Sequence, residues 1–430
     1  MANAAQKLAV RAYNLTWKAV MPTLRLNARL KEGYSQRNFT DPLPPADIWI
    51  QAASGGEAYL AQAILRHFHP PAPVRVLLTT NTRQGMDVIE HTIGHEALSP
   101  HIHCVAGYFP FDCPDGMMRT LEAVDPGVMV FLELELWPGL LSALKRQGCP
   151  TFILNGRLTP KSLDKYMIWP ALWRFLAPDQ ILAISPSDAA RFQTLFPKTR
   201  IGVMPNIKFD ALMPEQAASP TRSELAGLIP DHAPSVVLGS TRQEEEQDIL
   251  NILKSLFADT PEAIIGLIPR HLHRIPFWRK TLADSHIPWV LRSETSIPAP
   301  PGTVVLWDVF GELAMAYTHF TAAFVGGSLA PLGGQNFLEP LKYGIRPVIG
   351  PSWTNFSWVG PDIVTDNLVR VGQDWKAVAH MLSQDLACPG DRDKIKTEFF
   401  HYITRRQGGI GMACDLILNA LEDIDCRRRP

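Results

Sequence analysis

Residues 46–80 read ADIWIQAASGGEAYLAQAILRHFHPPAPVRVLLTT, and this stretch decides the fold class. It begins with an apolar run, ADIWIQAA, and ends with another, VRVLLTT. Between them lie a Gly-Gly turn and EAYLAQAILRHF, whose apolar residues have helical spacing. Continuous apolar runs rich in Val and Ile are typical of strands that are buried on both faces of a parallel sheet. Strand, helix and strand in this order predict a βαβ unit.

The same alternation continues through most of the chain. The further runs are IHCVAGYFP, VMVFLELE, TFILNG, ILAISP and IGVMPN in the first half, and SVVLGS, AIIGLIPR, PWVLRS, TVVLWDV, TAAFVGGS, RPVIGP and LVRVG in the second. A chain of 430 residues exceeds what one core usually supports. The sequence therefore predicts an α/β protein with two Rossmann-like, doubly wound domains that face each other across a cleft. Ligands are expected in this cleft, because open α/β sheets bind them outside the carboxyl ends of their strands.

Changes in composition suggest the domain boundaries. We expect five segments: a basic amphipathic membrane-associating segment at 1–40, an N-terminal Rossmann-like domain at 41–206, a Pro-, Ala- and Ser-rich linker at 207–234, a C-terminal Rossmann-like domain at 235–390, and a C-terminal helix at 391–430.

Composition excludes several classes of protein. The net charge is −1 and 19% of the residues are charged, so no nucleic-acid partner is expected. The six cysteines and thirteen histidines are scattered without metal-ligand spacing, so we expect neither a metal nor another cofactor. No GxGxxG follows the first strand and no GxxxxGK[ST] occurs, which disfavours dinucleotide oxidoreductases and P-loop NTPases.

The first forty residues carry seven Lys and Arg but a single acid, Glu32. Arg11 and Lys18 interrupt the apolar residues, so no run approaches the roughly 18–20 residues that span a bilayer. Basic residues mixed with Leu, Trp and Tyr favour a helix that lies on an anionic membrane surface. The alternative is an ordinary helix packed on the N-terminal domain.

Polar residues follow four apolar runs of the first half: SGGE (54–57), TTNTRQG (79–85), FLELELWP (131–138) and NGRLTPKS (155–162). The third is the most informative, because Glu133 and Glu135 lie two residues apart and should share one face of a strand. Two close carboxylates repel, so one tends to keep its proton or to pair with a cation. Asn155, Arg157 and Lys161 follow the next strand, and that cation could come from there.

The second half repeats this arrangement with GSTRQEEE (239–246), LIPRHLHR (267–274), WDVFGEL (307–313) and AFVGGSLAPLGGQNFLEP (323–340). Any one of these turns is explained by capping alone. Together they predict a bound nucleotide or similar anion, held by backbone N–H groups and by Arg270. Asn336 is expected to be the N-cap of a helix, with Glu339 in its first turn.

The order of these motifs, together with YFPFDCPD and NIKFD, resembles the Kdo transferases of lipopolysaccharide synthesis over nearly the whole chain. The resemblance implies the GT-B fold and transfer of 3-deoxy-D-manno-octulosonate (Kdo), or a related ulosonate, from its CMP donor to a lipid A precursor. It further implies a peripheral or monotopic protein at the cytoplasmic face of the bacterial inner membrane.

The resemblance also implies that the domain at 41–206 binds the acceptor and that the domain at 235–390 binds the nucleotide-sugar, and it implies roles for residues. Glu32, in RLKEGYS, matches the general base, which takes the proton of the acceptor hydroxyl in a direct displacement. Residues expected to bind the acceptor or sugar are Ser54, Gly55, Gly56, Glu57, Thr82, Arg83, Glu133, Glu135, Arg157 and Lys208. Residues expected to bind the donor are Ser240, Thr241, Arg242, Pro269, Arg270, His271, Gly311, Glu312, Leu313, Gly334, Gln335, Asn336 and Glu339.

Four positions depart from the family pattern. Gln335 and Arg242 each replace a histidine, Gly33 follows the base where the family has Arg, and SGGE replaces Ser-Val-Gly-Glu. Two other interpretations therefore stay open at this point. One is a GT-B glycosyltransferase or 2-epimerase that uses a UDP-sugar. The other is a non-catalytic homologue.

Overall fold

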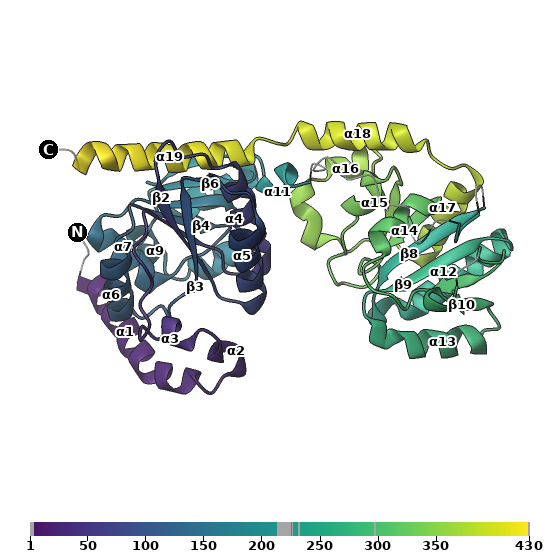
Figure 1. Cartoon of the computed structure of the whole chain (residues 1–430), viewed down its shortest axis with the longest axis horizontal. Helices are drawn as coiled ribbons and strands as arrows, with labels where there is room; N and C mark the ends of the chain where they lie inside the picture. Colours follow the sequence, from purple (N-terminus) through teal and green to yellow (C-terminus); the bar gives the residue numbers. More distant parts are fainter. Residues whose placement is uncertain (1–3, 213–224, 226, 231–232, 296–297, 429–430) are drawn as a thin grey trace. The chain divides into compact units, whose positions relative to one another are not determined.

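The computed structural model describes residues 4–212, 225, 227–230, 233–295 and 298–428. It divides into two compact units, which consist of residues 1–213 with 406–430 and of residues 214–405 (Figure 1). Each unit contains one seven-stranded sheet in which every strand pair is parallel. Each apolar run that we interpreted as a strand contains one. The prediction of an α/β protein with two doubly wound domains is confirmed.

The first sheet has the order β3-β2-β1-β4-β5-β6-β7. The chain builds outward from β1 in one direction and then from β4 in the other, so the switch point of the sheet lies between these two strands. The strands are β1 Ile48–Gln51, β2 Val74–Thr80, β3 Ile102–Tyr108, β4 Val128–Leu132, β5 Thr151–Gly156, β6 Gln180–Ala183 and β7 Arg200–Val203.

Helices cover both faces of this sheet. Successive residues of a strand point to opposite faces, and each face forms its own hydrophobic core with the helices that cover it. Ile48 and Ile50 pack with α4, α5 and α19, whereas Trp49 packs with α6, α7 and α10 on the other face. The helices of the unit are α1 Ala4–Leu24, α2 Ala28–Lys31, α3 Tyr34–Arg37, α4 Gly55–His67, α5 Arg83–His95, α6 Pro114–Val124, α7 Pro138–Gln147, α8 Pro160–Tyr166, α9 Pro170–Phe175, α10 Pro186–Leu195, α11 Ile207–Asp210 and α19 Gly409–Arg428.

The second sheet has the order β10-β11-β9-β8-β12-β13-β14, with its switch point between β8 and β12. Its strands are β8 Ser235–Thr241, β9 Ile264–Pro269, β10 Trp289–Leu291, β11 Val304–Leu306, β12 Ala322–Val325, β13 Pro347–Ile349 and β14 Arg370–Val371. Its helices are α12 Glu246–Asp259, α13 Ile275–Asp284, α14 Leu313–His319, α15 Leu338–Lys342, α16 Asp362–Thr365, α17 Trp375–Ala387 and α18 Arg392–Thr404, and four 3₁₀ turns lie at Gln243–Glu245, Leu272–Arg274, Arg292–Glu294 and Thr354–Val359.

The C-terminal segment differs from the single helix that we predicted for 391–430. It forms two helices, of which α18 belongs to the second unit and α19 to the first (Figure 1). The Asp210 carboxylate explains the break, because it accepts hydrogen bonds from the backbone N–H groups of Gly408, Gly409 and Ile410 at 2.8, 3.0 and 3.3 Å. These N–H groups lie at the start of α19, where no intrahelical partner exists. Most of the predicted linker, residues 213–224, 226 and 231–232, lies outside the described residues.

The N-terminal helix α1 packs on the first unit through its polar and aromatic side chains. The Tyr13 hydroxyl donates to Asp112 (2.9 Å), and the ring of Trp17 stacks on Phe111. Asp112 is buried, and its carboxylate also accepts from the N–H groups of Gly139 and Leu140 in α7. Burial raises the pKa of Asp112 to about 7. In the described part of the chain, no helix combines the length and the apolar character needed to cross a bilayer.

Candidate active site

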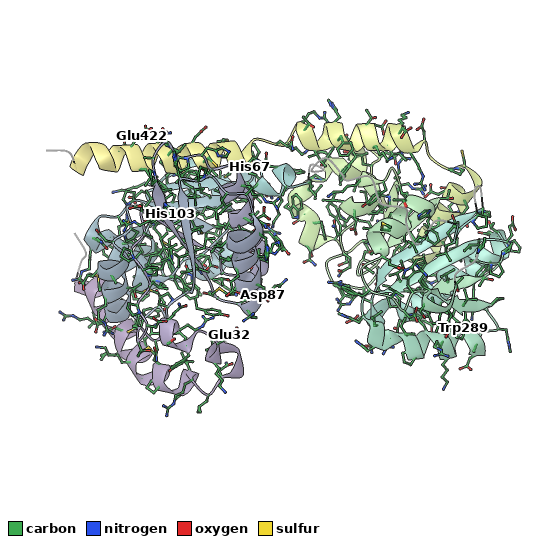
Figure 2. All side chains as sticks on the ribbon, in the orientation of Figure 1. Glu32, His67, Asp87, His103, Trp289 and Glu422 are labelled. Carbon is green, nitrogen blue, oxygen red and sulfur yellow. The ribbon has the colours of Figure 1, made fainter. Side chains whose placement is uncertain are left out.

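Glu32 lies between α2 and α3, and its carboxylate is paired with the guanidinium group of Arg83 in the first turn of α5. The Nε atom of Arg83 also contacts Asp87, at 2.6 Å. Figure 2 shows Glu32 and Asp87 near one end of the first unit and His67 and His103 toward the other. Because α5 begins where β2 ends, Glu32 lies at the carboxyl edge of the sheet. Its side chain is 42% exposed, so a substrate can reach it.

Tyr108, the last residue of β3, lies next to Glu32, with its ring against Gly33. The guanidinium group of Arg37 lies 4.5 Å from the centre of the Tyr108 ring, and its Nε donates to the backbone carbonyl of Glu32 at 3.2 Å. Gly33 has φ 63°, and a Cβ there would fall 1.8 Å from the Tyr108 ring. Glycine is therefore required at this position, which gives a structural reason why no arginine follows Glu32 in this chain.

Three carboxylates gather near the switch point of the first sheet. Glu133 accepts a hydrogen bond from Lys208 Nζ at 2.7 Å, and Glu135 accepts one from Trp137 Nε1 at 2.5 Å. Burial, followed by the nearby carboxylate of Glu57, raises the pKa of Glu135 to about 7. This end of the sheet therefore combines one carboxylate paired with a cation and one that holds its proton near neutral pH.

The geometry of this pair differs from our prediction in two respects. β4 ends at Leu132 and Glu133 has φ 58°, so Glu133 and Glu135 lie beyond the strand and do not share one of its faces as we predicted. They are close because the chain turns sharply after β4. We expected a cation from the residues that follow β5, but the one paired with Glu133 is Lys208, which follows β7.

A series of contacts leads from the backbone of Glu32 through Arg37, Asn81 and Gln51 to Glu135. Arg37 donates to the backbone carbonyl of Asn81 at 2.9 Å, and Gln51 Nε2 donates to the Asn81 side chain at 3.3 Å. Gln51 is fully buried, and its hydrogen bond favours the ionised form of Glu135. Glu32 and Glu135 are therefore two parts of one polar edge.

Most of the other residues predicted in the first unit lie at the starts of helices. Ser54 and Glu57 form a capping box at the start of α4, in which Glu57 accepts from the Ser54 N–H at 2.6 Å. Gly55 and Gly56 are the first residues of α4. Thr82 is the N-cap of α5. Arg157 follows β5 and is half-buried.

In the second unit, the loops after β8 and β12 meet at the switch point. Ser240 has φ 55°, and the register of β8 with β9 shifts at this residue. Thr241 is buried, and no partner of its Oγ1 lies within the described residues. A Cβ at Gly326 would lie 2.6 Å from the Ser240 carbonyl oxygen, so only glycine allows the two loops to approach this closely.

Glu245 holds these two loops together. Its carboxylate is 1% exposed and accepts hydrogen bonds from the N–H groups of Gly327, Ser328 and Leu329 at 2.6, 2.9 and 2.9 Å. It also accepts from the N–H of Arg242, at 3.1 Å. A buried carboxylate with four donors is well compensated, so it fixes the shape of the loop after β12.

Three cationic or titratable side chains extend from the loops after β8 and β9. Arg270 and His271 are exposed, and the side chain of Arg242 is 28% exposed. The pKa of His271 is lowered, first by partial loss of hydration and then by the charges of Arg242, His273 and Arg270. These groups are therefore near neighbours at the carboxyl edge of the second sheet. Such a cluster attracts an anion such as phosphate.

The GGQN turn lies against the loop after β12. The N–H groups of Gly334 and Gln335 donate to the carbonyls of Gly327 and Gly326 at 2.7 and 3.1 Å. Asn336 is not the N-cap that we predicted, because α15 begins at Leu338 with Phe337 at the N-cap position. The Asn336 side chain instead accepts from the Leu338 N–H at 3.3 Å and is exposed.

Two predicted carboxylates of the second unit differ in their surroundings. Glu312 is held by the guanidinium group of Arg292 at 3.0 and 3.1 Å and by Trp307 Nε1 at 2.8 Å, beside Gly311 and Leu313 at the start of α14. These contacts occupy its carboxylate. Burial raises the pKa of Glu339.

Sequence reasoning missed Glu245, Gln51 and Tyr108. Gln51 gave a signal, because an amide at the end of an otherwise apolar strand run must find a partner when it is buried. Glu245 is one of three consecutive glutamates, and Glu246 is buried too. Only the fold shows that Glu245 binds backbone N–H groups, whereas Glu246 pairs with Arg274.

Comparison with known proteins defines the class first. The crystal structure of a UDP-N-acetylglucosamine 2-epimerase matches with a TM-score of 0.54 and 12% identity, and covers 90% of this chain and 98% of that one. At this identity the likeness concerns the fold alone. Two successive Rossmann-like units of this kind define the GT-B fold.

The relatives then define the family. The model of the family "3-Deoxy-D-manno-octulosonic-acid transferase (kdotransferase)" matches residues 19–211. The 3-deoxy-D-manno-octulosonic acid transferase of Bordetella pertussis is 30% identical over 384 residues, covering 88% of this chain and 87% of the relative. That of Haemophilus influenzae is 28% identical over 409 residues, covering 93% and 92%. The chain belongs to the 3-deoxy-D-manno-octulosonic acid transferase family and is a glycosyltransferase.

Proposed function

We propose that the protein transfers Kdo, or a related ulosonate, from a CMP donor to a lipid A precursor in lipopolysaccharide biosynthesis, with Glu32 as the general base. The relatives named above are Kdo transferases, which supports Kdo as the sugar that is transferred. The observation that carries the proposed mechanism is the position of Glu32: its carboxylate is exposed at the carboxyl edge of the first sheet, and Arg37, Tyr108 and Arg83 hold it there.

In the proposed reaction, Glu32 takes the proton of the acceptor hydroxyl as that oxygen attacks the anomeric carbon of the sugar. The bond between the anomeric carbon and the phosphate oxygen breaks, and CMP leaves with the bonding electrons. Arg270 and Arg242 stabilise the charge that develops on the phosphate. The carboxylate of Glu32 is paired with Arg83, and this ion pair must loosen when the acceptor hydroxyl approaches.

The acceptor is proposed to bind the polar edge of the first unit. Carboxylates and amides are suitable partners for sugar hydroxyl groups, and Glu133 and Glu135 lie where such a ligand would reach the switch point. Lys208 and Arg157 are the candidates for a phosphate of the acceptor or for the carboxylate of the sugar. The proposed donor site consists of Ser240, Thr241, Pro269, the GGQN turn and the cations of the second unit.

The membrane surface enters the proposal through α1. The face opposite Tyr13 and Trp17 carries Leu8 and Leu15, which are 68% and 66% exposed, with Ala12 between them. This spacing places a second apolar stripe on the outside of the helix. We therefore propose that α1 lies on the anionic cytoplasmic face of the inner membrane.

Glu32→Gln tests the mechanism. Removal of a general base should lower the rate of transfer by about 10²–10⁴-fold, whereas binding of the donor should stay unchanged. The measurement is mass spectrometry of lipid A precursor incubated with CMP-Kdo and protein, which also counts the sugars added. Glu90→Gln, which alters an exposed carboxylate on α5, is the control. Equal product from Glu32→Gln and wild type would remove Glu32 from this role.

The identity of the donor is tested separately by thermal unfolding with CMP and with UDP. A ligand that binds only the native protein raises the unfolding temperature. We expect a shift with CMP. A shift with UDP alone would reject the CMP donor and favour a UDP-sugar.

A further inference from the structure

The turn between α8 and α9 exposes three consecutive large apolar side chains. Met167, Ile168 and Trp169 are 36%, 83% and 46% exposed. Exposed apolar residues usually occur singly on soluble proteins, and contiguous groups mark sites of interaction. We propose that this apolar turn, residues 167–169, inserts into the surface of an anionic membrane as a second contact beside α1. The inference gives the proposed lipid acceptor a place at the bilayer, and in that sense it rests on the proposed function.

The backbone of the apolar turn suits an apolar environment. The N–H groups of Met167, Ile168 and Trp169 donate to the carbonyls of Leu163, Lys165 and Tyr166 at 2.8, 3.3 and 3.2 Å. A segment that enters lipid needs such internal partners, because an unpaired N–H costs several kcal/mol in hydrocarbon. Insertion of this turn would leave none of the three N–H groups unpaired.

The apolar turn is also firmly anchored. The rings of Tyr166 and Trp173 pack edge to face with their centres 4.9 Å apart, and both residues contact the core of the first unit. Pro170 begins α9 directly after the turn. Because both flanking helices are fixed, the exposed side chains do not need to become ordered on binding, which lowers the entropic cost of insertion.

The basic side chains around the apolar turn favour an anionic bilayer as its binding partner. Lys161, Lys165 and Arg174 flank the apolar turn and are exposed, whereas the stretch 161–174 contains a single acid, Asp164. Within the described ranges, none of the three cations has an ion-pair partner. Basic side chains around an exposed apolar tip bind the headgroups of anionic lipids while the tip enters the acyl region.

The position of the apolar turn relates it to the candidate active site. The pKa of Tyr166 is raised by burial and then by the charge of Glu135, so the base of the turn lies near Glu135. Helix α9 also packs against α1. The turn would therefore hold the bilayer surface next to the proposed acceptor site.

Vesicle sedimentation of the full chain tests the inference. The double variant Ile168→Ser, Trp169→Ser should bind vesicles of phosphatidylethanolamine and phosphatidylglycerol roughly tenfold more weakly than wild type. The control is Phe310→Ser, which removes a side chain that is 78% exposed in the second unit and should leave binding unchanged. The triple variant Lys161→Ala, Lys165→Ala, Arg174→Ala should lose binding severalfold, and its binding should depend less on salt than that of wild type.

Two outcomes would overturn the inference. The first is wild-type vesicle binding by the double variant, and a raised KM for the lipid acceptor in that case would assign the turn to the acyl chains of the acceptor. The second is an equal loss of binding in Phe310→Ser. Vesicle binding needs neither donor nor acceptor, so the result is independent of whether the proposed reaction is correct.

Discussion

The two units share one plan, a parallel sheet with a switch point, but they differ in some of the charged side chains that follow the strands at that edge. In the first unit the carboxyl edge carries Glu133 and Glu135, with Lys208 as the cation bound to one of them. In the second unit the corresponding edge carries Arg242 and Arg270. Glu245 joins the loops after β8 and β12 at the switch point of the second unit, and backbone N–H groups occupy its carboxylate.

This difference shows that topology and charge decide separate matters. The order of the strands fixes where a ligand binds, because the loops on either side of a switch point diverge and leave a crevice. The side chains at that crevice decide which ligand binds. An edge rich in carboxylates and amides suits hydroxyl groups, whereas arginines suit a phosphate. The comparison therefore supports an acceptor site in the first unit and a donor site in the second.

The largest expected effect comes from Glu245→Ala, which would break the second site alone. The change leaves four backbone N–H groups without their buried acceptor, so we expect a loss of about 3 kcal/mol in the free energy of unfolding. Urea unfolding of the full chain measures this loss. Hydrogen exchange at residues 327–329 should accelerate, because the N–H groups there lose their partner.

Glu244→Ala is the matched control for this prediction. Glu244 is the neighbouring residue, its side chain is 48% exposed, and it lies 3.8 Å from Arg242. An exposed pair at this distance contributes little, so unfolding should change by less than about 0.5 kcal/mol. Equal effects of the two alanine variants would contradict the assignment of Glu245 as the residue that fixes the loop.

The sequence predicts the sheets well because their signal is local. Each strand is a short apolar run that ends in a turn residue, as in VRVLLTT before TTNTRQG, and the burial of parallel strands on both faces makes these runs continuous. The place of the sites also follows from the sequence, since polar residues after parallel strands must lie at one edge. Glu133, Glu135, Arg242 and Arg270 follow β4, β8 and β9, as this argument predicts.

The partners within each site could not be predicted from the sequence. Glu133 pairs with Lys208, which is 75 residues away, and Glu245 binds N–H groups more than 80 residues away. Such contacts depend on strand order and on loop conformation, and no local pattern contains them. The left-handed backbone of Glu133 is a second example, because a glutamate after an apolar run gives no sign that the strand ends there.

The second-largest effect is expected from Glu135→Gln, which tests whether the ionised form of Glu135 destabilises the first unit. The pKa of Glu135 is raised from 4.5 to about 7, so its contribution to stability is fully present below pH 4.5 and is lost as the pH rises through 7. Glutamine carries no charge at any pH and can still accept from Trp137. The variant should therefore exceed wild type by about 2 kcal/mol in the free energy of unfolding near pH 8, with a difference that shrinks toward pH 4.5.

Denaturant unfolding at several pH values measures this effect. The control is Glu122→Gln, an exposed carboxylate of α6, which should follow wild type at every pH. A Glu135→Gln variant that is less stable than wild type near neutral pH would show that the charge of Glu135 is compensated in the fold. Glu135 would then be a buried carboxylate whose charge is compensated by hydrogen-bond donors, as Glu245 is in the second unit.

The smallest effect is expected from Arg270→Ala, and it tests the charge of the second edge directly. Arg270 is exposed, so water and salt screen its contribution, and we expect CMP to bind only about fivefold more weakly. The loss should shrink as salt is added, because screening weakens the contact in wild type while the variant has none to lose. Calorimetric titration of CMP at low and high salt measures both quantities, with Lys280→Ala, an exposed cation of α13, as the control. If Lys280→Ala weakened CMP binding as much as Arg270→Ala did, the general positive charge of the unit, and not this cluster, would attract the nucleotide, and the contrast between the two edges would lose its meaning for the donor.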